Sequence, residues 1–320
     1  MILLVTGGAG FIGSNYIRHH LAHNPTDEII NVDLLTYAGN PNNLADLKNN
    51  GEYHFIQEDI SNFKGMEAIF KKFDIDAVIN FAAETHVDRS ISNPDTFIHT
   101  NVLGTHTLLN LAMQYDLKKF VHVSTDEVYG SIVSGSFSES DCLSPSSPYS
   151  ASKAGSDLIA LSYQITYHVP VIVTRCTNNF GPYQFPEKLI PLFITNLLEG
   201  KKVPVYGTGK NVREWIYVLD HCSALDLLLK KGKSGEIYNI SSGNERCNLE
   251  ITDCLLNLLK KDSSMINYVD DRPGHDFRYS IDSSKIRKLG WSPSFSFDNA
   301  LKETVDWYKT NRWWWEPLKQ

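Results

Sequence analysis

The chain has 320 residues, of which 42% are hydrophobic and 21% are charged, a composition typical of soluble globular enzymes. Its formal net charge of −7 argues against a nucleic-acid-binding protein, because that function needs a basic stripe or patch. The length is sufficient for one large domain and a smaller lobe.

The cysteines and the first residues favour a cytoplasmic protein. The five cysteines are scattered and show no Cys-x-x-Cys or Cys/His ligand spacing, so we expect free thiols in a reducing compartment and no bound metal. The opening MILLVTGGAG is too short an apolar run for a signal peptide, and no segment approaches the length of a membrane span. The sequence predicts neither a membrane nor a nucleic acid as partner.

The first predicted strand leads into a glycine-rich turn. Residues 2–6 form an apolar, β-branched run typical of a central parallel strand. Gly7, Gly10 and Gly13 follow, before a helical segment that reaches His20. Glycines at such a turn let the backbone approach a pyrophosphate at a helix N-terminus. Because the spacing has one residue more than G-x-G-x-x-G, the glycines alone leave an ordinary strand–helix turn open.

An acidic residue strengthens the nucleotide-binding interpretation. The second predicted strand, residues 28–33, ends at Asp33, twenty residues after Gly13. A carboxylate at this place binds the ribose hydroxyls of a dinucleotide and repels the 2′-phosphate of NADP. The sequence therefore predicts NAD as the cofactor.

Two further predicted strands end in polar or small residues. The strand at residues 53–57 is followed by Asp59 and Ile60, which we expect at the adenine. The strand at residues 77–81 is followed by small residues that let the backbone lie against a cofactor, Ala82 and Ala83. His86, slightly further on, is interpreted as structural rather than as an acid or base.

A hydroxyl and two carboxylates follow the next predicted strand, at residues 119–123. Ser124 and Thr125 are followed directly by Asp126 and Glu127. Catalytic groups of parallel α/β sheets gather at such strand ends. The adjacent carboxylates therefore predict an acid/base pair.

A tyrosine and a lysine form a second chemical pair. Tyr149 and Lys153 stand four residues apart, which places both on one face of a helix that we expect to continue to about residue 168. Since a neighbouring ammonium favours the phenolate, we expect Tyr149 to act as a base well below its usual pKa of about 10.

The remaining apolar runs complete a sheet. Strands are predicted at residues 171–175 and 236–240, and a helix at residues 101–115. Strands that alternate with helices predict an α/β fold, a doubly wound parallel Rossmann-type sheet of about seven strands.

The helix that contains Tyr149 also carries an apolar stripe. We expect much of this stripe to pack on the sheet. A part left exposed would form a homodimer seam with helix 101–115. The stripe consists of Ala151, Ala154, Leu158, Leu161 and Ile165.

Two stretches interrupt the strand–helix alternation. The first, residues 176–212, is rich in proline and glycine, and the second, residues 243–320, has a helical pattern with loops. We expect residues 1–175 and about 213–242 to form the cofactor-binding domain. Residues 176–212 and 243–320 then form a discontinuous substrate lobe. In it, the Arg213 guanidinium is a candidate to bind a diphosphate bidentately. The candidate cations of the lobe are Lys188, Arg213, Arg272 and His275.

These motifs resemble those of the extended short-chain dehydrogenase/reductases, and within that superfamily those of the dTDP-glucose 4,6-dehydratases. The glycine spacing and Tyr-x-x-x-Lys mark the superfamily, and Thr-Asp-Glu at 125–127 separates the dehydratases from sugar 4-epimerases. The matching segments are TGGAGFIGS at 6–14, AAETHVDRSI at 82–91, STDEVYG at 124–130, SPYSASKA at 147–154, TRCTNNFGPYQFPEKLIP at 174–191, YGTGKNVREWIYV at 206–218 and DRPGHDFRY at 271–279.

The resemblance implies an NAD-dependent lyase that converts dTDP-glucose to dTDP-4-keto-6-deoxyglucose. In such an enzyme Tyr149 removes the 4-hydroxyl proton, with Lys153 and Thr125 beside it. Asp126 protonates the departing 6-hydroxyl, and Glu127 takes the C5 proton.

The resemblance also implies two sets of binding residues. The cofactor contacts are Gly7, Gly10, Phe11, Ile12, Gly13, Asp33, Thr36, Asp59, Ile60, Ala82, Ala83, Thr100, Ser124, Tyr149 and Lys153. The substrate contacts are Thr85, His86, Thr125, Asn178, Asn179, Glu187, Lys188, Leu189, Pro204, Tyr206, Arg213, Asn248, Arg272 and His275.

The sequence departs from the family pattern at few places. Thr85 stands where Ser is usual, Phe180 where Tyr is usual, and Glu214 where Asp is common, while serines at 241–242 replace a Gly-Gly pair. The tryptophans at 313–315 match an aromatic tail of the family, and we expect them to serve packing.

Three alternatives remain open at this point. A UDP-sugar 4-epimerase shares everything except the Asp-Glu pair. A dehydratase for a UDP-, CDP- or GDP-sugar would keep the same triplet and differ only in the base pocket. A non-catalytic NAD-binding regulator would have no reason to keep Thr125, Tyr149 and Lys153 together.

Overall fold

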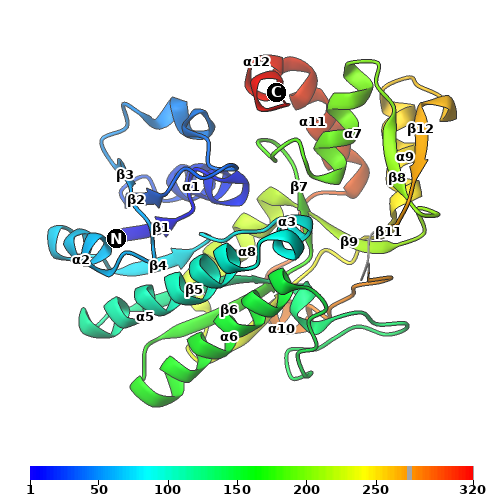
Figure 1. Ribbon diagram of the computed structural model, residues 1–320. Helices are drawn as coiled ribbons and strands as arrows, with labels where there is room; N and C mark the ends of the chain where they lie inside the picture. Colours follow the sequence, from blue (N-terminus) through cyan, green and yellow to red (C-terminus); the bar gives the residue numbers. More distant parts are fainter. Residues whose placement is uncertain (272–275, 320) are drawn as a thin grey trace.

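A seven-stranded parallel sheet forms the centre of the molecule (Figure 1). The structure is a computed structural model that describes residues 1–271 and 276–319. The strand order is β10-β6-β5-β4-β1-β2-β3. Successive strands are therefore added first on one side of β1 and then on the other, as in doubly wound folds. This confirms the predicted fold class. The strands are β1 (Ile2–Thr6), β2 (Glu28–Asp33), β3 (Tyr53–Gln57), β4 (Ala77–Asn80), β5 (Lys119–Thr125), β6 (Val171–Cys176) and β10 (Ile237–Ile240).

The largest difference from the predicted strands is at the end of β5. This strand runs two residues beyond the predicted residue 123, because Ser124 and Thr125 still pair with Arg175 and Cys176 of β6. The strand end therefore holds the Thr125 backbone in the sheet, with the two carboxylates directly after it.

Alternation along the strands creates a core on each side of the sheet. Leu3 and Val5 belong to one buried cluster, with residues of α1 (Phe11–His23) and α8 (Val218–Lys231). Leu4 belongs to the other cluster. Because successive side chains of a strand point to opposite faces, one short strand contributes to both cores. The helices of the second face are α2 (Phe63–Lys72), α5 (Thr105–Gln114) and α6 (Pro148–Tyr167).

The helix predicted at 101–115 is α-helical only over its second part. Ile98–Gly104 forms a wider π-helical turn, η2, and α5 follows from Thr105. The buried Asn101 side chain lies in this turn. Its amide bonds to the backbone of Glu84 and to the Ser152 hydroxyl.

The apolar stripe of α6 lies mainly at the surface, which contradicts the expectation that much of it packs on the sheet. Leu158 is 59% exposed and Ile165 is 73% exposed. The inner face of α6 is instead rich in small and polar side chains, because it borders the candidate active site and a buried ion pair of Asp157 with Arg175.

Smaller elements cover the carboxyl ends of the strands. A three-stranded sheet contains β7 (Asn178–Phe180), β9 (Val212–Tyr217) and β11 (Glu245–Cys247). A two-stranded sheet contains β8 (Val203–Tyr206) and β12 (Ile266–Val269). The helices of this part are α7 (Leu189–Leu198), α9 (Asn248–Leu258), α11 (Phe297–Thr310) and α12 (Arg312–Trp315).

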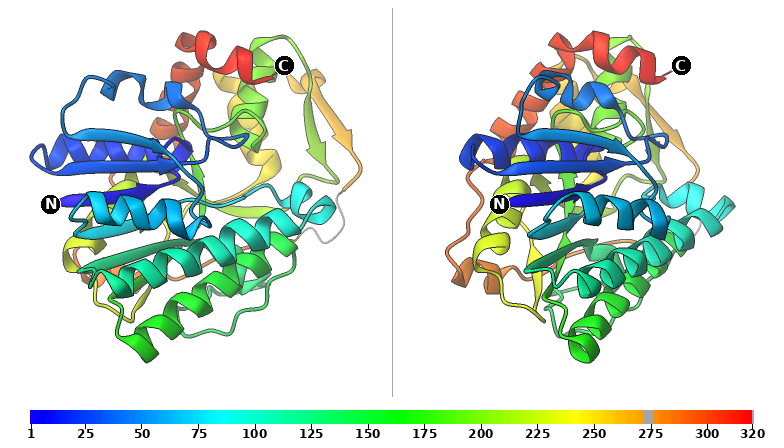
Figure 2. Two further views of the ribbon diagram at one scale, coloured as in Figure 1. Left: turned by 60° about the vertical axis from the view of Figure 1, so that its left-hand side comes forward. Right: turned by 90° about the vertical axis from the view of Figure 1, so that its left-hand side faces the viewer.

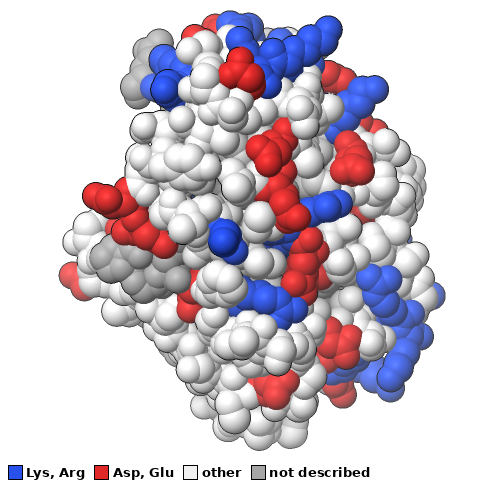
Figure 3. All heavy atoms as spheres, turned by 90° about the vertical axis from the view of Figure 1, so that its right-hand side faces the viewer, with Lys and Arg blue, Asp and Glu red and all other residues white. Residues whose placement is uncertain are grey.

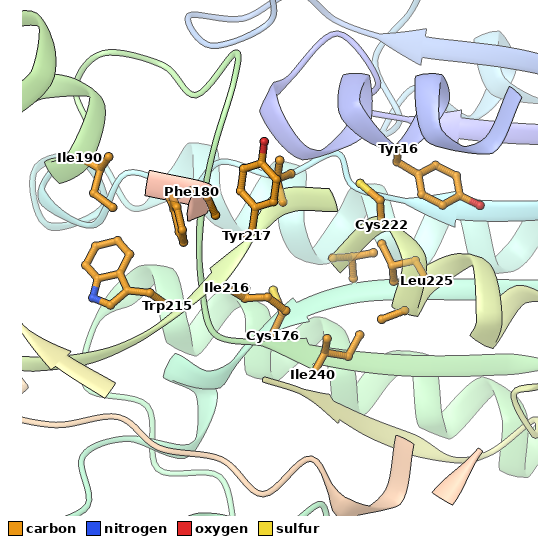
Figure 4. Close-up of a cluster of buried hydrophobic side chains, with 14 of the residues drawn as sticks. Tyr16, Cys176, Phe180, Ile190, Trp215, Ile216, Tyr217, Cys222, Leu225 and Ile240 are labelled. Carbon is orange, nitrogen blue, oxygen red and sulfur yellow. The ribbon is translucent and has the colours of Figure 1, made fainter. Parts of the chain in front are cut away.

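Short segments complete the fold. They are η1 (Pro41–Leu47), α3 (Val87–Ser92), α4 (Asp95–Phe97), η3 (Asp126–Tyr129), η4 (Ser263–Met265), α10 (Ser284–Lys288) and η5 (Glu316–Lys319). The buried core is continuous from the large sheet into the smaller elements. Tyr16 of α1, Leu225 of α8 and Trp215 of β9 belong to one cluster (Figure 4).

Helix length and surface charge of the described residues bear on what a membrane or a nucleic acid would require. Within residues 1–271 and 276–319, no helix is both long and apolar enough to cross a bilayer. On the side that carries the small sheets, Lys and Arg are intermixed with Asp and Glu (Figure 3).

Candidate active site

A cavity of about 320 Å³ lies at the carboxyl ends of the large sheet, the place where open α/β sheets bind their ligands. All residues predicted to be catalytic or to contact the cofactor line this cavity. Five residues predicted to contact the substrate join them, namely Thr85, Asn178, Asn179, Glu187 and Lys188.

The other described residues predicted to contact the substrate are not part of the cavity wall. Arg272 and His275 lie outside the described residues. The remainder are His86, Leu189, Pro204, Tyr206, Arg213 and Asn248. Sequence reasoning also missed some wall residues, among them Tyr37, Glu84 and Phe185, because each comes from a loop whose path depends on the fold.

The glycine-rich turn needs its glycines for steric reasons. Gly7 has φ +67°, and a Cβ there would lie 2.6 Å from the backbone nitrogen of Ala82. A Cβ on Gly13 would lie 2.5 Å from the Gly7 carbonyl oxygen. The turn therefore packs backbone against backbone, and α1 begins immediately after it with Gly10 as its N-cap. This is the arrangement that receives a pyrophosphate.

The Asp33 carboxylate is fixed beside this turn. Its Oδ2 accepts the N–H of Ala9 at 2.9 Å and its Oδ1 accepts the N–H of Leu35 at 2.8 Å. Burial raises the pKa of Asp33, and these two N–H donors oppose the shift. The carboxylate is thus held in place at the end of β2, where the ribose of a dinucleotide would lie.

The Thr125–Glu127 triplet forms a compact acid/base group. The Thr125 hydroxyl accepts the N–H of Glu127 and donates to Asp126 Oδ1, each at 3.2 Å. Asp126 is 2% exposed, and its Oδ2 has no hydrogen-bond partner in the part of the chain that the structure describes. Burial, followed by the charges of Glu127 and Glu214, raises the pKa of Asp126 well above its ordinary value. The carboxyl is therefore suited to carry a proton.

Tyr149 and Lys153 occupy the first turns of α6, which begins sharply. Ser147 and Ser150 form a capping box, and Pro148 occupies the first turn. Lys153 is buried and its Nζ donates to the Val123 carbonyl oxygen at 2.8 Å. Burial lowers the pKa of Lys153 to about 8.

The expectation that the pKa of Tyr149 lies well below 10 is wrong for this structure. Burial, followed by the negative charge of Glu127, raises the pKa of Tyr149 well above its ordinary value. The Thr125 hydroxyl, which is hydrogen-bonded to the phenol, opposes the shift. The sequence showed the spacing of Tyr149 and Lys153 but not the burial or the nearby carboxylates, and these dominate here.

Residues around Glu187 bring together two segments of the cavity wall that are distant in sequence. Lys188 Nζ donates to the Thr85 carbonyl oxygen at 3.3 Å. Glu187 Oε2 lies 3.5 Å from His86 Nε2 and 3.7 Å from Arg89 NH2. His86 therefore takes part in this contact between loops, and its structural role stays a prediction.

Arg213 is held by backbone carbonyl oxygens and an aromatic ring. Its guanidinium donates to the backbone carbonyl oxygens of Val212 at 2.8 Å and of Asp276 at 2.9 Å. It also lies 4.4 Å above the ring of Tyr279. The side chain is buried, and the binding of a diphosphate by Arg213 stays a prediction.

Glu214, the neighbour of Arg213, is a buried carboxyl outside the cavity wall. It is 2% exposed and accepts the Gly243 N–H at 2.8 Å and the Ser241 hydroxyl. Burial raises the pKa of Glu214 from 4.5 to about 7.

The raised pKa predicts a loss of stability as the pH rises. The folded state holds this proton more tightly than the unfolded chain does. The contribution of Glu214 to the free energy of unfolding is therefore full below about pH 4.5 and is lost as the pH rises through about 7. Glu214→Gln should remove this pH-dependent loss, which is at most ~3 kcal/mol. Denaturant unfolding at about pH 5 and about pH 8 measures it, and the same pH dependence in both proteins would contradict the assignment.

Comparison with known proteins agrees with this geometry. A model of the family described as GDP-mannose 4,6 dehydratase matches residues 4–304. A dTDP-glucose 4,6-dehydratase of Streptomyces niveus is 49% identical over 324 aligned residues, which cover 100% of this chain and 96% of that protein. The chain belongs to the dTDP-glucose 4,6-dehydratase family.

Solved structures of both dehydratases and epimerases resemble this chain over nearly its whole length. DesIV of Streptomyces venezuelae, a dTDP-glucose 4,6-dehydratase solved with NAD bound, is 54% identical with a TM-score of 0.97, covering 99% of this chain and 100% of that one. A UDP-glucose 4-epimerase of Thermotoga maritima is 30% identical with a TM-score of 0.91, covering 98% and 100%. Because dehydratases and epimerases share the fold, the fold alone does not decide the reaction.

Proposed function

We propose that this member of the dTDP-glucose 4,6-dehydratase family converts dTDP-glucose to dTDP-4-keto-6-deoxyglucose. The observation that carries the proposal is the buried Asp126, which is suited to hold a proton beside Glu127 and Tyr149 in one cavity. An epimerase needs no such acid, because it removes no hydroxyl group.

The residues at the glycine turn fit NAD. Gly7 and Gly13 let the turn pack tightly against neighbouring backbone, where a Cβ would clash, and α1 begins directly after the turn, as at a pyrophosphate site. The fixed carboxylate of Asp33 suits the ribose hydroxyls. NAD held there would supply the acceptor for a hydride from C4 of the sugar and the donor that returns it to C6.

Tyr149 has the role of taking the proton of the 4-hydroxyl. The Thr125 hydroxyl hydrogen-bonds to the phenol, and the Lys153 ammonium is held at the end of β5 by the Val123 carbonyl oxygen. In the protein described, the phenol is protonated. A base role therefore requires that its pKa falls when substrate and cofactor fill the cavity.

Asp126 and Glu127 divide the elimination of water between them. Once C4 is a ketone, the C5 hydrogen becomes acidic, and Glu127 removes it. Asp126 donates its proton to the 6-hydroxyl, so that the C6–O bond breaks and water leaves. Each group contributes typically 10²–10⁴-fold to such a step.

A comparison of nucleotide sugars tests which nucleotide the enzyme prefers in its substrate. Purified protein should form a 4-keto product from dTDP-glucose faster than from the UDP-, CDP- and GDP-sugars. Faster turnover of one of the other nucleotide sugars would show that this sugar, and not dTDP-glucose, is the preferred substrate. Turnover of none, with NAD still bound, would favour a regulator.

The division into two lobes stays part of the proposal. The sheet that contains β1 and β10 would bind NAD, with residues 1–175 and about 213–242. The smaller sheets and the C-terminal helices would then cover the nucleotide sugar, with residues 176–212 and 243–320. The joint lining of one cavity by Asp33 and Lys188 supports this division.

The exposed stripe of α6 supports a homodimer. Leu158 and Ile165 of α6 are exposed. Large apolar side chains of the neighbouring η2 and α5 are exposed as well, namely Ile98, Leu103 and Met113. A copy of this chain would cover such a face by helix pairing. Because the described cysteines are all free, we place this dimer in the reducing cytoplasm.

Sedimentation tests the homodimer. The wild type should sediment as a dimer at micromolar concentration, and the double variant Leu158→Glu/Ile165→Glu should sediment as a monomer. Val133→Glu is the matched control, because Val133 is 94% exposed and lies in another part of the chain. A monomeric wild type would contradict the dimer.

A further inference from the structure

We propose that Trp314 and Asn43 are positioning residues that keep NAD bound by holding the glycine-rich turn in its binding shape. This inference rests on the proposed function, since it assigns NAD to that turn. It gives a role to the C-terminal aromatic segment, for which the sequence suggested only packing.

A chain of hydrogen bonds runs from the C-terminus to the predicted ribose site. Trp314 Nε1 donates to Asn43 Oδ1 at 2.7 Å, and Asn43 Nδ2 donates to the Ala9 carbonyl oxygen at 2.8 Å. The N–H of the same residue, Ala9, donates to Asp33 Oδ2 at 2.9 Å. Trp314, Asn43 and Ala9 are all almost fully buried. The Ala9 peptide groups are thereby fixed on both sides, between Gly7 and Gly10 of the turn.

The indole N–H and the Ala9 carbonyl oxygen together determine which way the Asn43 amide points. An indole N–H is only a donor, whereas an amide has an accepting oxygen and a donating NH₂ group. With the Trp314 N–H in front of it, the amide must turn its oxygen towards the indole. Its NH₂ group then faces Ala9. Without the indole N–H, the amide loses this constraint.

The same aromatic cluster also contacts the substrate side of the cavity. The Tyr183 ring lies 4.6 Å from the Trp307 ring and 5.7 Å from the Trp314 ring, centroid to centroid. The Tyr308 hydroxyl donates to the carbonyl oxygen of Gln184, a residue of the cavity wall. The C-terminal helices therefore lie against η1 (Figure 2) and also hold the loop that leads to Glu187.

This arrangement matters because the cofactor is not exchanged during the reaction. The hydride removed from C4 has to return to C6 of the same sugar, so release of the cofactor between the two steps would leave an unfinished ketone. Bonds that stabilise the turn in its binding shape slow that release.

The test measures how long NAD stays bound. Trp314→Phe keeps an aromatic ring but removes the N–H, and it should release radiolabelled NAD about tenfold faster after dilution into unlabelled NAD. Asn43→Ala should do the same, and the double variant should be no faster than either single one. The KM for dTDP-glucose at saturating NAD should stay unchanged, which a general loss of structure would not allow.

Trp313→Phe is the matched control. Trp313 is adjacent in sequence but 58% exposed, and among the described residues its indole bonds only locally, to Asn311. NAD release from Trp313→Phe should therefore equal that from the wild type. Release from folded Trp314→Phe at the rate of Trp313→Phe would overturn the inference. If Trp314→Phe does not fold, Asn43→Ala decides on the same criterion. A wild type that retains no NAD would instead contradict the proposed function, and the inference with it.

Discussion

Tyr149→Phe is expected to lower the rate of the first hydride transfer by 10²–10⁴-fold, while the affinity for dTDP-glucose stays nearly unchanged. The substitution removes only the phenol oxygen, so packing of the ring beside Phe97 is kept. Without the oxygen, the cavity lacks the group proposed to take the 4-hydroxyl proton as the hydride leaves.

Absorbance of the reduced cofactor after rapid mixing with substrate measures this step. Tyr167→Phe is the matched control, because Tyr167 belongs to the same helix but is 54% exposed, and its rate should equal that of the wild type. Reduction of bound NAD at the wild-type rate in Tyr149→Phe would show that another group is the base.

Variants that lack one of the two carboxylates, Asp126 or Glu127, are expected to stall at a later step than Tyr149→Phe does. Glu127→Gln should still oxidise C4 but stall at the 4-keto-hexose with its 6-hydroxyl intact, because an amide cannot remove the C5 proton. Asp126→Asn should also oxidise C4 and then lose the 6-hydroxyl 10²–10⁴-fold more slowly, for want of a proton donor.

Mass spectrometry of the quenched sugar nucleotide follows this stall, because loss of water changes the mass. Exchange of the C5 hydrogen with heavy water separates the two variants. Asp126→Asn should retain exchange and Glu127→Gln should lose it. Exchange in Glu127→Gln at the wild-type rate would assign the C5 proton to another base.

Local patterns were sufficient for the large sheet. The strands that contain Leu4, Val32 and Ile172 are short, β-branched runs bounded by turns, so pattern and structure agree within one or two residues. Asp33 was also predictable, because its distance from Gly13 is set by one strand–helix–strand unit.

The features that sequence reasoning missed depend on contacts between distant segments. The pKa of Tyr149 depends on burial and on Glu127, which lies on another element. The contacts of Arg213 involve Asp276. The bond between Asn43 and Trp314 joins residues 271 positions apart, and neither residue carries a local signal of it.

Deuterium placed at C4 of dTDP-glucose provides the most direct test of the dehydratase reaction. We expect the label to appear at C6 of a 4-keto-6-deoxy product, and deuterium from heavy water to enter C5 through Glu127. Recovery of the label at C4, with the 6-hydroxyl still attached and no solvent deuterium at C5, would contradict the dehydratase reaction and indicate an epimerase.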